Sequence, residues 1–175
     1  MIDQSIIVKS ICAATEEVFT TMLGMEVKAG APYQAKNRTD PIDGVVSLIG
    51  LAGAWVGTGS ISCSAPFACQ LSGRLLMSEF QNVDEEVLDA IAEITNMIIG
   101  NFKTSIEERL GPMGLSIPTV VFGRNFSTRS IGTDDWVVVP FECEGGCLEV
   151  RACLAPARTP QHVRHGFVQA TPVST

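Results

Sequence analysis

The segment from Asp84 to Arg109 constrains the fold of this chain more than any other part of the sequence. On a helical wheel its large apolar side chains fall on one arc, and its charged and polar side chains fall on the opposite side. The apolar arc consists of Val87, Ile91, Ile94, Ile98, Phe102 and Ile106. Gly111 and Pro112 follow, where a helix is expected to end. We therefore predict an amphipathic helix over residues 84–109 that buries one face against a second layer of structure.

The segments on both sides of this helix have the composition and alternation of β-strands. The predicted strands cover about residues 25–36, 44–51, 54–63, 117–123, 136–143 and 147–154. Ala52 and Gly53 separate the second strand from the third, and Gly145 and Gly146 lie between the fifth and the sixth. Each of these two pairs is therefore predicted to form a hairpin.

Two further helices complete the pattern. Asp3 can cap a first helix that ends before Gly24, and Pro66 begins a short second one. The apolar residues of the first helix are Ile7, Ile11, Ala14, Val18 and Met22. Strands and helices do not alternate strictly, so we predict an α+β fold whose mainly antiparallel sheet of about six strands is covered by long helices. The single domain should occupy residues 1–155, with residues 156–175 as a C-terminal extension, either loop or loosely docked.

Charge and hydropathy argue against several classes of function. The chain of 175 residues has 19 acidic and 12 basic side chains, so its net charge of −7 gives nucleic-acid binding little support. It contains no apolar run near the length of about 18 residues that a membrane span needs, and its start resembles no signal peptide. We expect a cytoplasmic protein that contacts neither membrane nor nucleic acid, and whose six cysteines are free thiols.

The polar face of the predicted long helix carries Glu93 and Asn96 three positions apart, so their side chains are neighbours. From the spacing alone, a solvated helix face with no further role is the more common explanation of such a pair, because exposed polar stripes are the rule on surface helices. Gly100 lies in the same stripe, one turn beyond Asn96, although a glycine inside a helix costs about 1 kcal/mol relative to alanine. Close approach by another backbone, next to the Glu–Asn pair, is one physical reason for a glycine there.

With these residues in these positions, the sequence resembles a known protein family. Asp89, three residues, Glu93, two residues and Asn96 match the phosphatase helix of the CheC/CheX chemotaxis phosphatases. The blocks VFTTMLGMEV, DGVVSLIGLAGAWVGTGSISC and IPTVVFGRN are similar as well, so the resemblance covers about residues 5–155. A single such helix resembles the CheX type rather than CheC, which has two. In the CheC pattern a proline follows the Asn, and Pro118 lies near the corresponding distance.

A second Glu-x-x-Asn pattern, Glu79 to Asn82, lies where the short helix is predicted to end, and we interpret it as coincidence.

The resemblance implies a CheC/CheX-like fold and a phosphatase that hydrolyses the aspartyl phosphate of a CheY-like receiver domain in two-component signalling. Asn96 would orient the attacking water, and Glu93 would pair with the active-site Lys of the receiver. Asp89, Gly100 and Lys103 would contact the same partner. The chain would need no cofactor of its own, because Mg²⁺ belongs to the receiver, and it would form a homodimer, as CheX-type members do.

Three alternatives stay open. A module of the same fold could bind a receiver without hydrolysing its phosphate, or could serve as a flagellar-switch-like scaffold. Separately, Cys143 and Cys147 flank the Gly-Gly turn, where they are expected to face each other, and with His162 and His165 they suggest a zinc site. Two residues between the histidines are fewer than the usual three to five, which argues against zinc.

Overall fold

The long amphipathic segment forms helix α3, Glu85–Leu110, as predicted. The computed structural model describes residues 2–36, 42–128 and 135–157. The Asp84 side chain accepts a hydrogen bond from the Val87 N–H (3.0 Å), and Gly111 follows the last helical residue. This bond satisfies one of the N–H groups that the first turn leaves without a partner. Every residue of the predicted apolar arc is buried, so α3 enters the core along its whole length.

The first helix, α1, covers Gln4–Val18, and its cap is the predicted Asp3. It continues directly into a π-helix, η1, Phe19–Leu23, which ends at Gly24 in the left-handed conformation (φ +60°). The prediction that Met22 belongs to the apolar face is wrong, because its side chain is 49% exposed. A π turn contains more residues than an α turn, so the first and last residues of η1 take the buried positions instead.

One antiparallel sheet of eight strands makes up the other layer of the described residues. The strands are β1 Val27–Ala29, β2 Tyr33–Ala35, β3 Ile42–Gly53, β4 Trp55–Cys63, β5 Met113–Leu115, β6 Thr119–Phe126, β7 Trp136–Cys143 and β8 Gly146–Pro156. Their order is β1-β7-β8-β4-β3-β5, with β2 also paired to β7 and β6 also paired to β3. The β3–β4 and β7–β8 hairpins are therefore confirmed.

The α+β class is confirmed, but the sheet has two strands more than the six predicted. The first predicted strand, residues 25–36, divides into β1 and β2 around Pro32, which has no N–H to donate to a sheet. β5 has only three residues, which is too short to produce a recognisable alternation in the sequence. β8 includes Pro156, one residue past the predicted domain boundary, and residues 158–175 lie outside the described part.

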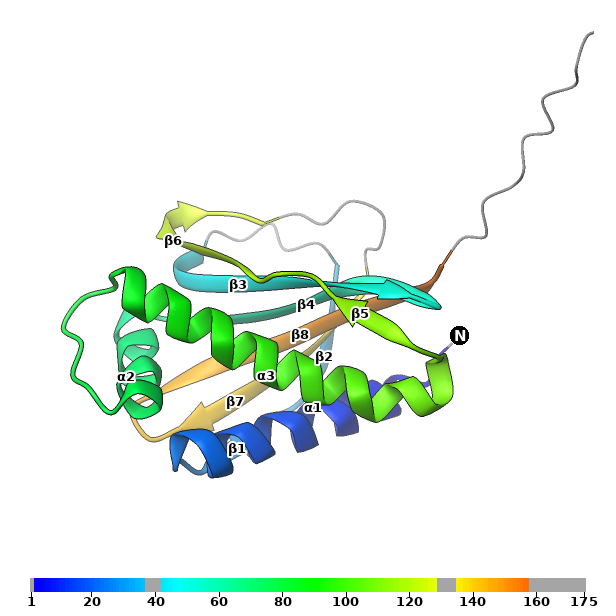
Figure 1. Ribbon diagram of the computed structural model, residues 1–175, viewed down its shortest axis with the longest axis horizontal. Coiled ribbons are helices and arrows are strands. Elements are labelled where there is room, and N and C mark those ends of the chain that lie inside the picture. Colours follow the sequence, from blue (N-terminus) through cyan, green and yellow to red (C-terminus); the bar gives the residue numbers. More distant parts are fainter. Residues whose placement is uncertain (1, 37–41, 129–134, 158–175) are drawn as a thin grey trace, which may run out of the picture.

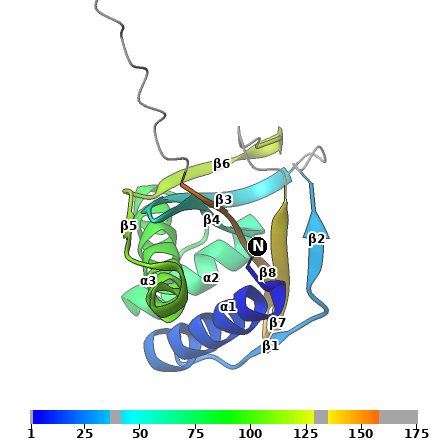
Figure 2. The same cartoon turned by 90° about the vertical axis from the view of Figure 1, so that its right-hand side faces the viewer.

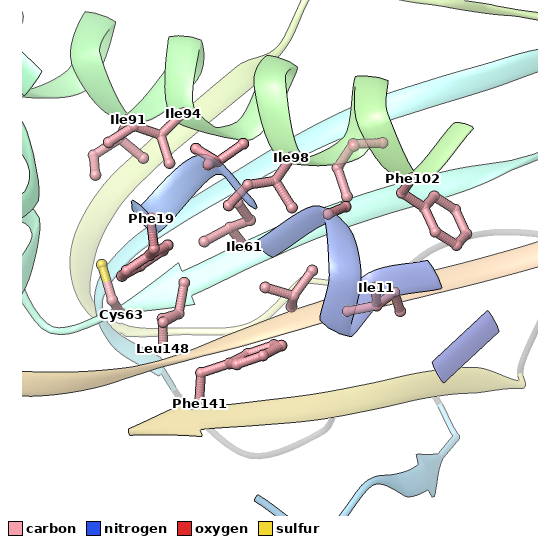
Figure 3. Close-up of a cluster of buried hydrophobic side chains, with 14 of the residues drawn as sticks. Ile11, Phe19, Ile61, Cys63, Ile91, Ile94, Ile98, Phe102, Phe141 and Leu148 are labelled. Atoms are coloured by element: carbon pink, nitrogen blue, oxygen red, sulfur yellow. The ribbon is translucent and has the colours of Figure 1, made fainter. Parts of the chain in front are cut away.

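The helices α1, α3 and α2, which covers Ala65–Leu76, all pack on one face of the sheet (Figures 1 and 2). Figure 3 shows Ile98 and Phe102 of α3 pointing into the space between helix and sheet, where Ile11 of α1 and Phe141 of β7 belong to the same core. Gly59 of β4 allows this approach, because a Cβ there would lie 2.7 Å from the side chain of Ile99 on α3. Packing against the sheet therefore fixes the rotation of α3 about its own axis.

None of the helices in the described ranges combines the length and the hydropathy that a membrane crossing requires.

Candidate active site

Glu93 and Asn96 lie side by side on the exposed face of α3, halfway along the helix. Both side chains are exposed, and neither has a hydrogen-bond partner among the residues that the structure describes. Thr95, between them in sequence, is fully buried and its Oγ1 donates to the carbonyl of Ile91 (2.7 Å). The polar pair therefore projects to solvent from a helix whose opposite side is held in the core.

The other residues predicted for this site lie along the same helix. Asp89 is exposed one turn before Glu93, and Gly100 is half-buried one turn after Asn96. A Cβ at Gly100 would meet only the Cδ1 of Leu115, at the ordinary contact distance of 3.8 Å. Within the described chain, no backbone approaches Gly100 closely enough to require a glycine, so the space beside it is open.

Lys103 is held away from the Glu93–Asn96 pair. Its Nζ lies 2.8 Å from Oε1 of Glu107, and the same oxygen accepts a hydrogen bond from the Met113 N–H (2.8 Å). These two donors lower the pKa of the Glu107 carboxyl. Ten residues of helix separate Lys103 from Glu93, which corresponds to about 15 Å along the axis. The structure therefore ties Lys103 to the start of β5 and places it at the far end of the polar stripe.

The segment that follows α3 runs back beside it in the opposite direction, through β5 and then β6 (Figures 1 and 2). Leu115 pairs with Leu51 of β3, and Thr119 pairs with Leu48. The three residues between Leu115 and Thr119 therefore lie opposite the two residues between Leu51 and Leu48, which defines a β-bulge. Pro118 is part of this bulge, so the proline near the expected distance from Asn96 lies between β5 and β6, beside the helix.

The local sequence pattern did not predict this bulge or its exposed side chain, Ile117, which is 88% accessible to solvent. A signal was present in Pro118, because a proline inside a predicted strand indicates an edge strand or a bulge. The second Glu-x-x-Asn pattern, Glu79 to Asn82, lies in the connection between α2 and α3. It is not on a helix, so the interpretation as coincidence is consistent with the structure.

The cysteines of the described ranges form no comparable arrangement. Cys143 pairs with Gly146, and Cys147 pairs with Glu142, so the two cysteines point to opposite faces of the hairpin. The expectation that they face each other is therefore wrong. His162 and His165, the other members of the suggested zinc set, lie outside the described residues.

All six cysteines are free, and burial raises the pKa of the Cys63 thiol to about 12. A thiol with so high a pKa is a poor nucleophile at neutral pH. An open hollow of about 610 Å³ lies near Arg74, Glu142 and Glu144, and no residue of α3 lines it.

An exposed carboxylate and amide on a convex helix face suit a macromolecular partner, because sites for small molecules are concave. A protein that acts on a macromolecular partner agrees with the comparisons to known families. The family model described as chemotaxis phosphatase CheX matches residues 45–142. The curated protein CheY-P phosphatase CheX of Thermotoga maritima is 29% identical over 127 residues, which cover 72% of this chain and 81% of that protein.

Solved structures agree on the fold. Chemotaxis protein CheX from Vibrio vulnificus has a TM-score of 0.75 at 27% identity, covering 85% of this chain and 99% of that chain. The CheX–CheY–BeF₃–Mg²⁺ complex from Borrelia burgdorferi contains a chain with a TM-score of 0.71 at 24% identity, covering 85% of this chain and 97% of its own. This protein belongs to the chemotaxis phosphatase CheX family. It is an enzyme of the phosphatase class.

Proposed function

We propose that this protein hydrolyses the aspartyl phosphate of a CheY-like receiver domain, with Asn96 and Glu93 acting together on α3. The observation that carries the proposal is the adjacency of an exposed amide and an exposed carboxylate on a helix anchored in the core. The Thermotoga relative is named as a phosphatase of phosphorylated CheY, and the Borrelia structure is a complex of CheX with CheY. Both names support a receiver as the partner of this chain.

The chemistry needs little from the phosphatase. An aspartyl phosphate is an acyl phosphate with a good leaving group, and the receiver itself supplies Mg²⁺ and a Lys that stabilise a loose transition state. The remaining task is to place a water in line with the breaking P–O bond. The amide of Asn96 suits this task, because its oxygen can accept from the water while its NH₂ donates to a phosphate oxygen. Positioning of this kind supplies several kcal/mol without a strong base.

Glu93 would fix the register of docking. In this proposal its carboxylate pairs with the Lys of the receiver, and Asn96 then enters the phosphorylation site. The net charge of −7 gives no long-range attraction to an acidic receiver site, so a local pair has to orient the two proteins. Asp89 and Lys103 extend the contact along the stripe. Gly100 leaves open space beside Asn96, which would allow the receiver backbone to approach the helix.

A rigid helix is the appropriate support for such a pair. The side chains around Asn96 that face inward, Thr95, Ile98 and Ile99, are completely buried. The amide therefore reaches the partner without the entropy loss that ordering a flexible loop would cost. A displacement of about 1 Å is enough to lower a rate about 100-fold when positioning provides the catalysis.

The test is the decay of a phosphorylated CheY-like receiver from the same organism, with and without this protein. Asn96→Ala should lose the acceleration while still binding the receiver, since only the water loses its acceptor. Asn101→Ala is the matched control, because Asn101 is an amide on the same helix that donates to Glu17 of α1 (3.2 Å). Parent-like hydrolysis by Asn96→Ala would exclude the assigned role. If the unmodified protein binds the receiver without accelerating decay, it is the non-catalytic module instead.

Glu93→Lys tests the docking step. A second positive charge facing the receiver Lys should raise KM about tenfold, while the rate at saturating receiver falls less. Glu93→Gln keeps the size of the side chain without its charge, so its KM should lie between those of the parent and of Glu93→Lys. An unchanged KM for both variants would show that Glu93 does not contact the receiver.

The homodimer and the cytoplasmic location are also proposals. Light scattering that finds only monomers at the concentration of the assay would exclude the dimer, and fractionation of cells would test the location.

A further inference from the structure

We propose that the bulge between β5 and β6 carries an apolar docking contact for the receiver, with Ile117 at its centre and Phe122 at its rim. This inference rests on the proposed function and adds a specificity-determining contact outside helix α3.

The bulge is built into the pairing with β3. Two hydrogen bonds between Gly50 and Ser116 fix the start of the bulge. The Ser116 N–H donates to the Gly50 carbonyl (2.9 Å), and the Gly50 N–H donates to Ser116 Oγ (2.8 Å). Regular pairing resumes at Thr119 and Leu48. Ile117 and Pro118 together therefore lie opposite one residue of β3. Bulges of this kind re-aim side chains, and here the result is an isoleucine that is 88% exposed.

Ile117 is level with Asn96. A Cβ at Gly100 would lie 3.8 Å from Leu115, so these two positions are direct neighbours on antiparallel segments. Two residues of extended chain cover about 6.6 Å from Leu115 to Ile117. Four residues of helix cover about 6 Å from Gly100 back to Asn96. The two side chains therefore lie at the same height, one on the helix and one on the segment beside it.

A partner that covers Asn96 also covers Ile117. A specific interface of ordinary size buries about 800 Å² on each side, which corresponds to a disc of about 16 Å radius. Ile117 lies well within such a disc centred on Asn96. Because burial of exposed apolar side chains drives association, the proposed partner gains from contacting Ile117. The polar stripe of α3 then supplies the chemistry, and the bulge supplies apolar contact area.

Phe122 continues this apolar edge. It pairs with Val45 of β3 and remains 49% exposed, although Val45 itself is buried. Five residues of extended strand place it about 16 Å from Ile117, so it can contact the receiver only at the outer margin of an interface centred on Asn96. Addition of a further strand does not account for the exposed Ile117, because Pro118 has no N–H to offer a neighbouring strand at that point.

The experiment measures the rate of receiver dephosphorylation as a function of receiver concentration. Ile117→Ser should raise KM about tenfold, equivalent to about 1.4 kcal/mol, with kcat within twofold of the parent. Phe122→Ser should raise KM about threefold, and Ile117→Leu should restore the parent KM. The control is Val56→Ser, because Val56 is 39% exposed and lies beside Gly57 on β4, on the face of the sheet without helices. Its KM should not change.

An unchanged KM for Ile117→Ser would overturn the inference. A lower kcat at constant KM would also overturn it, because a distorted helix rather than a lost contact would then explain the result. The failure of the inference is distinguishable from the failure of the proposed function. If the parent hydrolyses the receiver phosphate and Asn96→Ala does not, but Ile117→Ser behaves as the parent, only the docking contact is wrong. If the parent shows no acceleration, both are wrong.

Discussion

The chain contains the pattern Glu-x-x-Asn twice, and the two copies differ in what supports them. Glu93 and Asn96 lie on α3, whereas Glu79 and Asn82 lie in the connection between α2 and α3. All four side chains are exposed. Only on the helix does the spacing of three residues bring the carboxylate and the amide onto one face. Exposure and residue type alone therefore do not bring the carboxylate and the amide together, and the helical backbone beneath them does.

Substituting the amide of each Glu-x-x-Asn pattern should have very different effects on the rate of receiver dephosphorylation. Asn96→Ala should slow dephosphorylation of the receiver about 100-fold, because positioning of the water is lost. Asn82→Ala, with or without Glu79→Ala, should leave the rate within twofold. Single-turnover decay of the labelled receiver measures both. Equal losses from the two amides would contradict the distinction between helix and connection.

A second prediction removes the support beneath the pair and leaves the pair itself intact. Ile98→Ala deletes a fully buried side chain from the inner face of α3 and should lower the free energy of unfolding by about 2–5 kcal/mol. Denaturant titration followed by circular dichroism measures this. Val56→Ala, at a half-exposed position, serves as the control and should cost far less. A loss below 1 kcal/mol for Ile98→Ala would mean that α3 packs less tightly than described.

The cap of α3 provides a smaller test. Asp84→Ala removes the acceptor for the Val87 N–H and should lower the free energy of unfolding by about 1 kcal/mol. Asp84→Asn retains an acceptor and should recover most of this loss. Removing Glu79, which has no such role, should change the stability very little. Thermal unfolding of the three variants under one set of conditions checks the order.

The smallest effect concerns the pH dependence of the end of α3. The pKa of Glu107 is lowered in the folded state, first by Lys103 and then by the Met113 N–H. A lowered folded-state pKa contributes stability above the ordinary pKa of glutamate, and this contribution is lost as the pH falls through the folded value. Glu107→Gln should therefore unfold slightly more easily than the parent at pH 7, and the difference should vanish in acid. A difference that is constant with pH would contradict this.

Local pattern was sufficient for much of the fold. The bounds of α3, its buried arc, the Asp3 cap of α1 and both hairpins follow from interactions within a segment or across one turn. The exposure of Glu93 and Asn96 follows in the same way, because a helix that buries one arc must expose the opposite side. The residues that carry the proposed chemistry were therefore predictable.

Other features were not predicted. The π turn that exposes Met22 and the register that sends Cys143 and Cys147 to opposite faces are local, but they differ from what the pattern suggested. The short strand β5 forms only by pairing with β3. The bulge at Ile117 arises from the register of β5 and β6 against β3, which joins residues about 70 positions apart. The residues that α3 presents to solvent follow from the pattern of its own segment. What lies beside them depends on pairing between strands and packing of layers, which are set by the whole chain at once.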